Sequence, residues 1–326
     1  MIIARTPLRM SFVGGGSDLP IFYKEFGGAV VSTAINKYVY VTVNKKFDDH
    51  IRVSYSKTEE VENINQIEHK IVREVLKLLE FQGGMEITSI ADIPSKGSGL
   101  GSSSSFTVAL LHALNTFRSK AVSAQYLAEH ACKVEIDICQ EPIGKQDQYA
   151  AAFGGLNFIQ FNQDDSVFVE KIICSKETIK NLFENVIVFY TGISRSASAL
   201  LEKQQNVIQN EVNKKELLKQ MSTMAYDLKR ELENNNLTSF GEILHVNWML
   251  KKQILGFISS SDIDRWYELA MKNGATGGKI LGAGSGGFLM FYAPKEKHEA
   301  IKNALPNLKE IDFKYESQGS QIIFVH

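Results

Sequence analysis

The chain has 326 residues, which at about 100–200 residues per domain predicts two domains, each with a core of its own. Its 36 Lys and Arg residues against 37 Asp and Glu leave a net charge of −1, so nucleic acid and anionic membranes are poor candidates for partners. A hydrophobic content of 44% with 22% charged residues argues against a disordered or fibrous chain.

The first half of the chain mixes predicted strands and helices around glycine-rich segments. A stripe of apolar residues over 64–81 predicts an amphipathic helix, because its spacing follows the period of 3.6 residues. The other predicted elements are strands at 8–13, 29–43 and 85–91, a buried helix at 106–117, a helix at 123–140 stopped by Pro142, a short turn or helix from 144 to 154, and strands at 155–161 and 186–190.

Beyond Gly192 the pattern changes to long helices, and we place a domain boundary there, between 1–192 and 193–326. The elements predicted after it are helices at 196–234, 240–256 and 261–273, a strand at 277–281, a glycine loop, a strand at 287–292, a helix at 295–305 and strands at 309–314 and 320–325. The whole pattern is typical of an α+β protein.

Several kinds of site are disfavoured by spacing. The three cysteines form no CxxC pair, and the seven histidines form no HxH or HExxH motif, so a disulfide framework and a transition-metal site are not indicated. No G-x-S-x-G nucleophile elbow fits a strand–turn–helix, which disfavours acyl transfer. No basic flank precedes an apolar stretch at the N-terminus, and no run approaches ~18 uncharged apolar residues, so we expect a cytoplasmic protein with no membrane attachment.

The segment from Pro94 to Ser105 is the strongest candidate for an anion site. Gly97, Gly99 and Gly101 would let backbone N–H groups converge on a phosphate where a helix begins. The hydroxyls of 102–103 can reach a phosphate-bound Mg²⁺. The alternative is a flexible linker, but this segment lies between a strand and an apolar helix. It matches neither G-x-x-x-x-G-K-[ST] nor G-x-G-x-x-G, so a P-loop or Rossmann fold is not indicated.

Two further glycine clusters lie at 14–18 and 279–287. Each can be read as a tight turn that lets backbones pack closely, and neither is specific by itself. Together with the middle loop they are spread over both expected domains, as a cleft between the domains would require.

Phosphoryl transfer needs a metal, a cation at the migrating group and a carboxylate near the attacking hydroxyl, and each has a candidate. Asp147, in a turn bounded by Pro and Gly, is either a base or positioning acceptor or a helix cap. One of Glu135 and Asp137 should point inward if the other faces solvent, and an inward Glu135 would be a Mg²⁺ ligand rather than a surface charge. Arg9, on a buried strand, is either the cation or part of a structural ion pair.

The order of four segments, 7–18, 94–105, 144–148 and 282–287, resembles the GHMP small-molecule kinases, which include galactokinase, homoserine kinase and mevalonate kinase. The resemblance spans residues 4 to about 290. Within the family, RTPLRMSFVGGGSDLP and EPIGKQDQYAAAFGG are most similar to kinases that phosphorylate the anomeric hydroxyl of D-glycero-D-manno-heptose 7-phosphate. Three glycines at 14–16 depart from the Gly-Glu-His of galactokinase, which disfavours galactose.

The resemblance implies a two-domain kinase fold with the active site between the domains, ATP as phosphate donor and Mg²⁺ as metal. It implies that Asp147 is the base, that Arg9 replaces the family's catalytic Lys or Arg, and that Glu135 and Ser103 hold Mg²⁺. The expected ATP-binding residues are Pro94, Lys96, Gly97, Ser98, Gly99, Leu100, Gly101, Ser102, Ser103 and Ser104. The expected substrate-binding residues are Gly15, Gly16, Ser17, Asp18, Gly144, Lys145, Arg195, Gly284 and Ser285.

A phosphorylated sugar needs a cation that the ATP loop does not supply. Arg195, where a strand end opens a helix, can pair with a distal phosphate, and Lys37 and Lys145 are rival cations. An exposed arginine beside a helix cap is the alternative.

Other functions are a fucokinase-like or other sugar 1-kinase, and a non-catalytic sugar or nucleotide sensor on the same fold. The presence of Asp147, Glu135 and Arg9 argues against a sensor. A nicotinamide-dependent oxidoreductase would need an acidic residue at the end of the next strand, but helices follow the loop instead.

Overall fold

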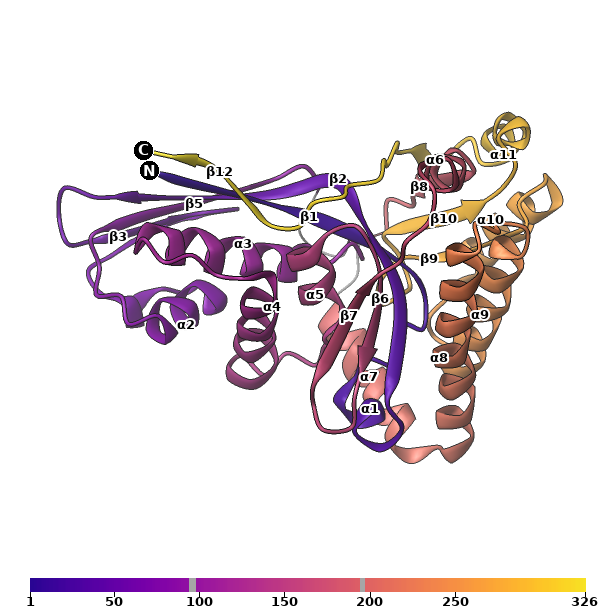
Figure 1. The fold of residues 1–326 in the computed structure, drawn as a ribbon, viewed down its shortest axis with the longest axis horizontal. Helices are drawn as coiled ribbons and strands as arrows, with labels where there is room; N and C mark the ends of the chain where they lie inside the picture. Colours follow the sequence, from indigo (N-terminus) through magenta and orange to yellow (C-terminus); the bar gives the residue numbers. More distant parts are fainter. Residues whose placement is uncertain (94–97, 194–196) are drawn as a thin grey trace.

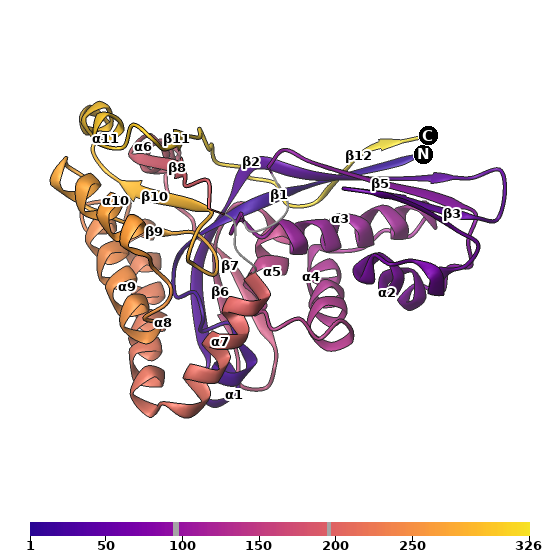
Figure 2. The same ribbon diagram turned by 180° about the vertical axis from the view of Figure 1, so that it is seen from behind.

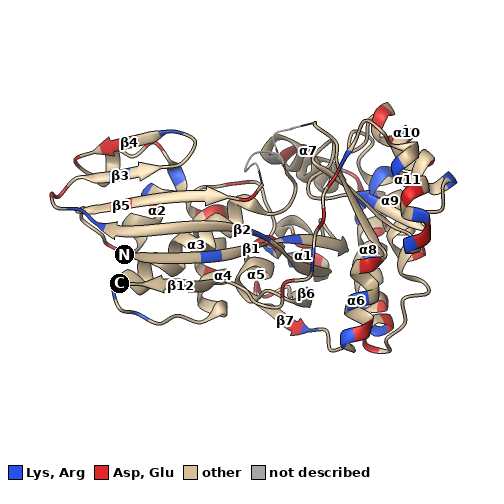
Figure 3. Cartoon of the chain, turned by 90° about the horizontal axis from the view of Figure 1, so that it is seen from above, with Lys and Arg blue, Asp and Glu red and all other residues tan. Residues whose placement is uncertain are grey.

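The structure is a computed structural model, and it describes residues 1–93, 98–193 and 197–326. Within these residues the strands form two sheets with helices packed against them, as Figures 1 and 2 show from opposite sides. The α+β architecture expected from the sequence is confirmed. Charged residues of both signs are interspersed over the helices at the α10–α11 end of the molecule (Figure 3).

The larger sheet is built around the antiparallel pair β1 and β2, whose register runs from Ile2 opposite Val43 to Val13 opposite Val31. The C-terminal strand β12 pairs with β1 on its other side, so the two ends of the chain lie side by side in Figure 1. The strands of this sheet are β1 (Ile2–Val13), β2 (Gly28–Lys45), β3 (Ile51–Ser54), β4 (Thr58–Val61), β5 (Met85–Ala91), β6 (Leu156–Phe161), β7 (Val167–Lys171) and β12 (Gln321–Val325).

The smaller sheet separates two hydrophobic cores. Along β8 and β10 successive side chains alternate, because a strand has a period of two. Val188 and Met290 belong to the core shared with the larger sheet, whereas Phe189 and Leu289 belong to a second core. The strands are β8 (Val186–Tyr190), β9 (Gly277–Ile280), β10 (Phe288–Tyr292) and β11 (Lys309–Glu310), in the order β11-β8-β10-β9.

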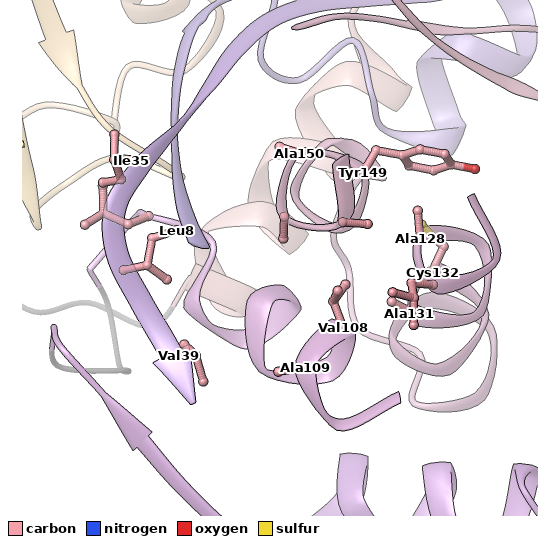
Figure 4. Close-up of a cluster of buried hydrophobic side chains, with 14 of the residues drawn as sticks. Leu8, Ile35, Val39, Val108, Ala109, Ala128, Ala131, Cys132, Tyr149 and Ala150 are labelled. Atoms are coloured by element: carbon pink, nitrogen blue, oxygen red, sulfur yellow. The ribbon is translucent and has the colours of Figure 1, made fainter. Parts of the chain in front are cut away.

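Helix α3 is central to the fold and is buried on nearly all sides. Its Val108 and Ala109 lie between the sheet residue Leu8 and the helix residues Ala128 and Tyr149 (Figure 4). This packing fixes the starts of α3 and α5, which reach the site described below. The helices are α1 (Pro20–Phe26), α2 (Lys70–Leu78), α3 (Ser102–Phe117), α4 (Ala124–Cys132), α5 (Gln146–Phe153), α6 (Lys176–Glu184), α7 (Ala197–Asn210), α8 (Val212–Glu233), α9 (Phe240–Ile254), α10 (Ser261–Lys272) and α11 (His298–Ala304).

The single helix expected over 64–81 is wrong in its first part. A 3-10 turn at Ile64–Gln66 is followed by extended backbone at Ile67, and α2 begins only at Lys70. The cause is the carboxylate of Glu59, which accepts hydrogen bonds from the backbone N–H groups of Glu68 and His69. A helix cannot pass through these residues while their N–H groups are bound by a side chain.

Two other expected helices are divided. The helix at 123–140 changes after Cys132 into a π-helical segment, Lys133–Ile138. The helix at 196–234 is interrupted by extended backbone at Glu211, and the chain turns between α7 and α8 (Figure 2). Five elements were not expected from the sequence: helices α1 and α6 and strands β3, β4 and β7. In the described residues no helix is both long and apolar enough to cross a bilayer.

Two strands cross the boundary that we placed at residue 192. Strand β8 precedes it but pairs with β10 and β11, and β12 follows it but pairs with β1. The division into 1–192 and 193–326 remains a proposal, and the pairing of strands does not follow it.

Candidate active site

A cavity lies where the first and third glycine clusters meet the start of α3. Its lining comes from β1 and the turn after it, the starts of α3 and α5, the π-helical segment, α7, α9, and β9 with the loop after it. The expected site residues that line it are Arg9, Gly15, Gly16, Asp18, Ser98, Gly99, Gly101, Ser102, Ser103, Ser104, Glu135, Gly144 and Asp147.

Arg9 and Asp147 form a bidentate ion pair at the cavity wall. Arg9 Nε lies 2.7 Å from Asp147 Oδ1, and Arg9 Nη2 lies 2.6 Å from Oδ2. The third guanidinium nitrogen, Nη1, donates to the carbonyl of Gly99 at 2.6 Å. Two parallel hydrogen bonds fix the plane of the carboxylate, so Arg9 orients Asp147 and ties it to the glycine loop.

The middle glycine loop ends at the first turn of α3. Gly101 is the N-cap residue of α3 with φ +76°, a backbone conformation that favours glycine. A Cβ at Gly101 would lie 3.3 Å from both Arg9 Cγ and Asp147 Oδ2, so the loop lies directly on the ion pair. The N–H groups at the start of α3 thus face the cavity beside Asp147, where a helix binds anions best.

Four residues of the expected ATP loop are not among the described residues that line the cavity. Leu100 is fully buried, and its carbonyl accepts a hydrogen bond from the Arg9 N–H at 3.1 Å, so its side chain belongs to the core. Pro94, Lys96 and Gly97 lie outside the described residues.

Glu135 points inward and Asp137 is exposed, which decides between the two orientations left open by the sequence. Glu135 Oε1 accepts from Ser103 Oγ at 2.8 Å, and its Oε2 accepts from Gln148 Nε2 at 2.7 Å. Burial raises the pKa of Glu135 to about 7, and the nearby Asp147 carboxylate adds to the rise.

The pair Glu135 and Ser103 fits a Mg²⁺ ion. Both offer hard oxygen donors, and Mg²⁺ is commonly bound by one or two carboxylates together with substrate phosphates. Within the described residues, the hydrogen bonds to Glu135 come from neutral side chains, so a divalent cation would supply a positive charge to this buried carboxyl. The described residues hold no cluster of three or more His, Cys, Asp or Glu side chains suited to a metal, which means that phosphate oxygens would have to complete the coordination.

Asp18 is buried and lines the cavity. Its Oδ1 accepts from the Gly16 N–H at 2.9 Å and its Oδ2 from the Gln146 N–H at 3.3 Å. Burial raises its pKa, and the Asp147 carboxylate raises it further. A Cβ at Gly144 would come within 2.0 Å of Asp18 Oδ2, which explains the glycine there.

The structure places four of the expected substrate-binding residues outside the cavity lining. The Ser17 hydroxyl bonds to the carbonyls of Gly14 and Ala29, and Lys145 pairs with Asp165 at 2.8 Å. The Ser17 hydroxyl is therefore engaged within its own turn, and the Lys145 ammonium is engaged by Asp165 away from the cavity.

Gly284 and Ser285 are the other two, and both pack against the loop after α9. A Cβ at Gly284 would lie 2.0 Å from Ile258 Cγ1, and Ser285 donates to the carbonyl of Phe257. The third glycine cluster instead lines the cavity with Gly282 and Ala283. Arg195 lies outside the described residues.

Sequence reasoning missed two buried lysines that line the cavity, Lys251 and Lys279. Lys279 Nζ donates to the carbonyls of Ser11 and Phe12, and burial holds its pKa well below the usual range. The third glycine cluster begins at Lys279, which was a usable signal. Lys251 stands beside Lys252 on an amphipathic helix, and no pattern in the sequence indicates which of the two points inward.

Comparison with known proteins identifies this arrangement. Residues 67–155 match the GHMP kinases N terminal domain, and residues 228–310 match GHMP kinases C terminal. The D-glycero-alpha-D-manno-heptose 7-phosphate kinase of Campylobacter jejuni is 30% identical over 318 residues, covering 92% of each chain. The chain belongs to the GHMP kinase family. It is therefore an ATP-dependent sugar kinase, as the sequence resemblance implied.

Two further relatives extend the comparison. A crystal structure of a D-glycero-D-manno-heptose 1-phosphate kinase from Bacteroides thetaiotaomicron superposes with a TM-score of 0.83 at 25% identity, covering 100% of both chains. The L-fucokinase/L-fucose-1-P guanylyltransferase of Bacteroides fragilis is 25% identical over 93% of this chain, which spans 35% of that longer protein. The fold extends to the galactokinase of Lactococcus lactis, with a TM-score of 0.79 at 16% identity.

Proposed function

We propose that this GHMP kinase transfers the γ-phosphoryl group of ATP to the anomeric hydroxyl of D-glycero-D-manno-heptose 7-phosphate, giving the 1,7-bisphosphate. The observation that carries the proposal is the full-length similarity to the Campylobacter jejuni kinase. The Arg9–Asp147 pair at the cavity wall supports a phosphoryl transfer of this kind.

In this mechanism the Asp147 carboxylate accepts a hydrogen bond from the attacking hydroxyl. Both its oxygens are held by Arg9, and lone pairs remain that can accept a hydrogen bond from the sugar. Phosphoryl transfer passes through a loose transition state, so correct placement of the hydroxyl contributes more than strong basicity. Asp147 therefore aims the oxygen and takes up its proton as the new bond forms.

The donor phosphates would lie at the start of α3. Backbone N–H groups of the first turn and the hydroxyls of Ser102 to Ser104 are available there, and the helix dipole favours negative charge. Glu135 and Ser103 would hold Mg²⁺, which when bound neutralises charge on the phosphates.

The acceptor would lie on the other side of Asp147, over Asp18. The Asp18 carboxyl is fixed by two backbone N–H groups and can hydrogen-bond sugar hydroxyls with its remaining capacity. Gly15 and Gly16 line this part of the cavity and leave it free of side chains at those positions.

The test is ADP release by the purified protein with ATP, Mg²⁺ and each of four acceptors: D-glycero-D-manno-heptose 7-phosphate, the unphosphorylated heptose, mannose 6-phosphate and L-fucose. We expect the highest kcat/KM with the heptose 7-phosphate, and a new phosphorus resonance coupled to the anomeric proton. A higher kcat/KM with L-fucose would replace the proposal with the fucokinase-like function, which the similarity to the Bacteroides fragilis protein favours next. Absence of ADP release with any sugar, in a protein that binds ATP, would support a sensor.

A further inference from the structure

Lys251 is a buried cation whose donors are largely unused. Its side chain lines the cavity, and the one hydrogen bond that Nζ makes within the described residues goes to the Gly282 carbonyl at 3.3 Å. An ammonium group has three donors, and this long contact uses one of them. The neighbouring Lys252 points elsewhere and pairs with Asp264 at 3.1 Å.

The other two buried cations of the cavity are bound more firmly by the protein. Arg9 uses all three of its nitrogens on Asp147 and Gly99, and Lys279 donates to two backbone carbonyls. Among the buried cations of the described cavity lining, Lys251 is therefore the one least engaged by the protein, with a single long hydrogen bond and no ion pair.

Two polar side chains converge with Lys251 on the backbone of Gly15. From the position that a Cβ of Gly15 would take, Ser11 Oγ lies 3.7 Å away, Gln146 Nε2 3.8 Å and Lys251 Nζ 4.0 Å. Ser11 Oγ and Gln146 Oε1 are buried and have no hydrogen-bond partner among the described residues. A buried polar atom without a partner is costly, so a ligand is expected here. The Ser11 hydroxyl and Gln146 Nε2 can donate to a phosphate oxygen, whereas Gln146 Oε1 accepts and would be completed by a hydroxyl of the sugar.

This cluster belongs to the acceptor side of the cavity. The Gln146 N–H donates to Asp18, and so does the N–H of Gly16, the residue after Gly15. The side chains expected to hold the metal, Ser103 and Glu135, are bonded to each other instead. A group bound at Gly15 would thus be attached to the sugar lying over Asp18.

We propose that Lys251, Ser11 and Gln146 form the subsite that binds the phosphate carried by the acceptor sugar. This inference rests on the proposed function, because it requires a phosphorylated acceptor. Ammonium, hydroxyl and amide donors from three elements would each meet a phosphate oxygen, and Gly15 leaves the space between them open. Burial lowers the pKa of Lys251 to about 8, and a bound phosphate dianion would favour the charged form.

Steady-state kinetics of Lys251→Met test the subsite, with Lys252→Met as the matched control. We expect the KM for heptose 7-phosphate to rise at least ten-fold in Lys251→Met, as for the loss of a charged hydrogen bond, with kcat lowered less than three-fold and the KM for ATP unchanged. Lys252→Met should keep the wild-type constants, since Lys252 does not line the cavity. A second variant, Ser11→Ala, should raise the same KM by about three-fold, and it covers the case in which Lys251→Met does not fold.

The possible outcomes test the phosphate subsite and the proposed substrate separately. A fall in kcat with an unchanged acceptor KM would show that Lys251 acts on the transferring phosphoryl group, which overturns the subsite. Wild-type KM values in both Lys251→Met and Ser11→Ala would overturn it as well. If wild-type protein uses heptose and heptose 7-phosphate equally, the proposed substrate itself is wrong. If it prefers the phosphorylated sugar while both variants retain that preference, the function stands and the subsite falls.

Discussion

The two ends of the cavity are built in different ways. At the donor end the polar side chains are already paired with each other: Ser98 with Ser102, and Ser103 with Glu135. At the acceptor end Ser11 Oγ and Gln146 Oε1 have no partner in the described part of the chain. The donor side chains thus hold one another in place. Gln148, which donates to Glu135, also has an Oε1 without a partner in the described residues, but it does not line the cavity, whereas Ser11 and Gln146 line it and can be completed by a substrate. We expect substitutions at the donor end to change the chemical step and metal use, and those at the acceptor end to change affinity and specificity.

Asp147 stands between the two ends, and its substitution should have the largest effect. In Asp147→Asn we expect kcat to fall by roughly 10²–10⁴, because the amide cannot take the proton of the attacking hydroxyl. Affinity for ATP should stay within two-fold, measured by calorimetric titration. Asp137→Asn is the control, since Asp137 is exposed on the preceding helical segment. A variant with near-normal kcat would remove Asp147 from the mechanism.

The next largest effect is expected where the third glycine cluster contacts the middle glycine loop. Gly282 has φ +79°, and a Cβ there would lie 2.4 Å from the Gly99 Cα, so Gly282→Ala forces the loops apart. We expect a loss of about 2 kcal/mol in unfolding free energy and a lower kcat. Gly192→Ala is the matched control, because its φ of +71° is similar but no atom lies within 4 Å of its Cβ position. Equal losses in both variants, measured by denaturant titration, would reduce the effect to backbone strain.

Glu135→Gln tests the donor end. If Glu135 binds Mg²⁺, the concentration of Mg²⁺ that gives half-maximal activity should rise about ten-fold, the value of one charged contact. The acceptor KM at saturating Mg²⁺ should be unchanged. A Mg²⁺ titration that overlays the wild-type curve would contradict the ligand role.

The smallest expected effect is a dependence of kcat/KM on pH that comes from Lys251 at the acceptor end. Lys251, with its pKa lowered to about 8 by burial, is faced by Asp18, Arg9 and Asp147, and it loses its charge above that pH. Because the charged form binds phosphate, kcat/KM for heptose 7-phosphate should be highest below about pH 8 and should fall as the pH rises past that region. The profile of Lys251→Met should lack this decline. A decline that persists in the variant would assign it to another group.

The same contrast explains how much could be predicted from sequence. The donor end is a local segment, and the glycines before a buried helix predicted a phosphate site at the start of α3. The acceptor end joins β1, α5 and α9, and its residues have no common motif. The inward position of Lys251 depends on how α9 packs, and that of Glu135 on a π-helical segment that changes the helical phase, so neither follows from a regular period.

The predicted fold shows a similar limit. The strand pattern was correct at 85–91, where pairing partners are not needed to recognise a strand. The start of the helix expected at 64–81 depended on Glu59, a side chain of strand β4. The pairing of β8 with β10 joins residues about a hundred positions apart. Such long-range contacts override local preference.

The pairing of β12 with β1 has a consequence for how the protein is made. Strand β1, which carries Arg9, is synthesised long before residues 321–325, yet these residues form the neighbour on one of its sides. During translation this edge of the sheet has unpaired N–H and C=O groups, which can pair with other chains. The larger sheet is thus completed only after residues 321–325 leave the ribosome, and overexpression should be most prone to aggregation before that point.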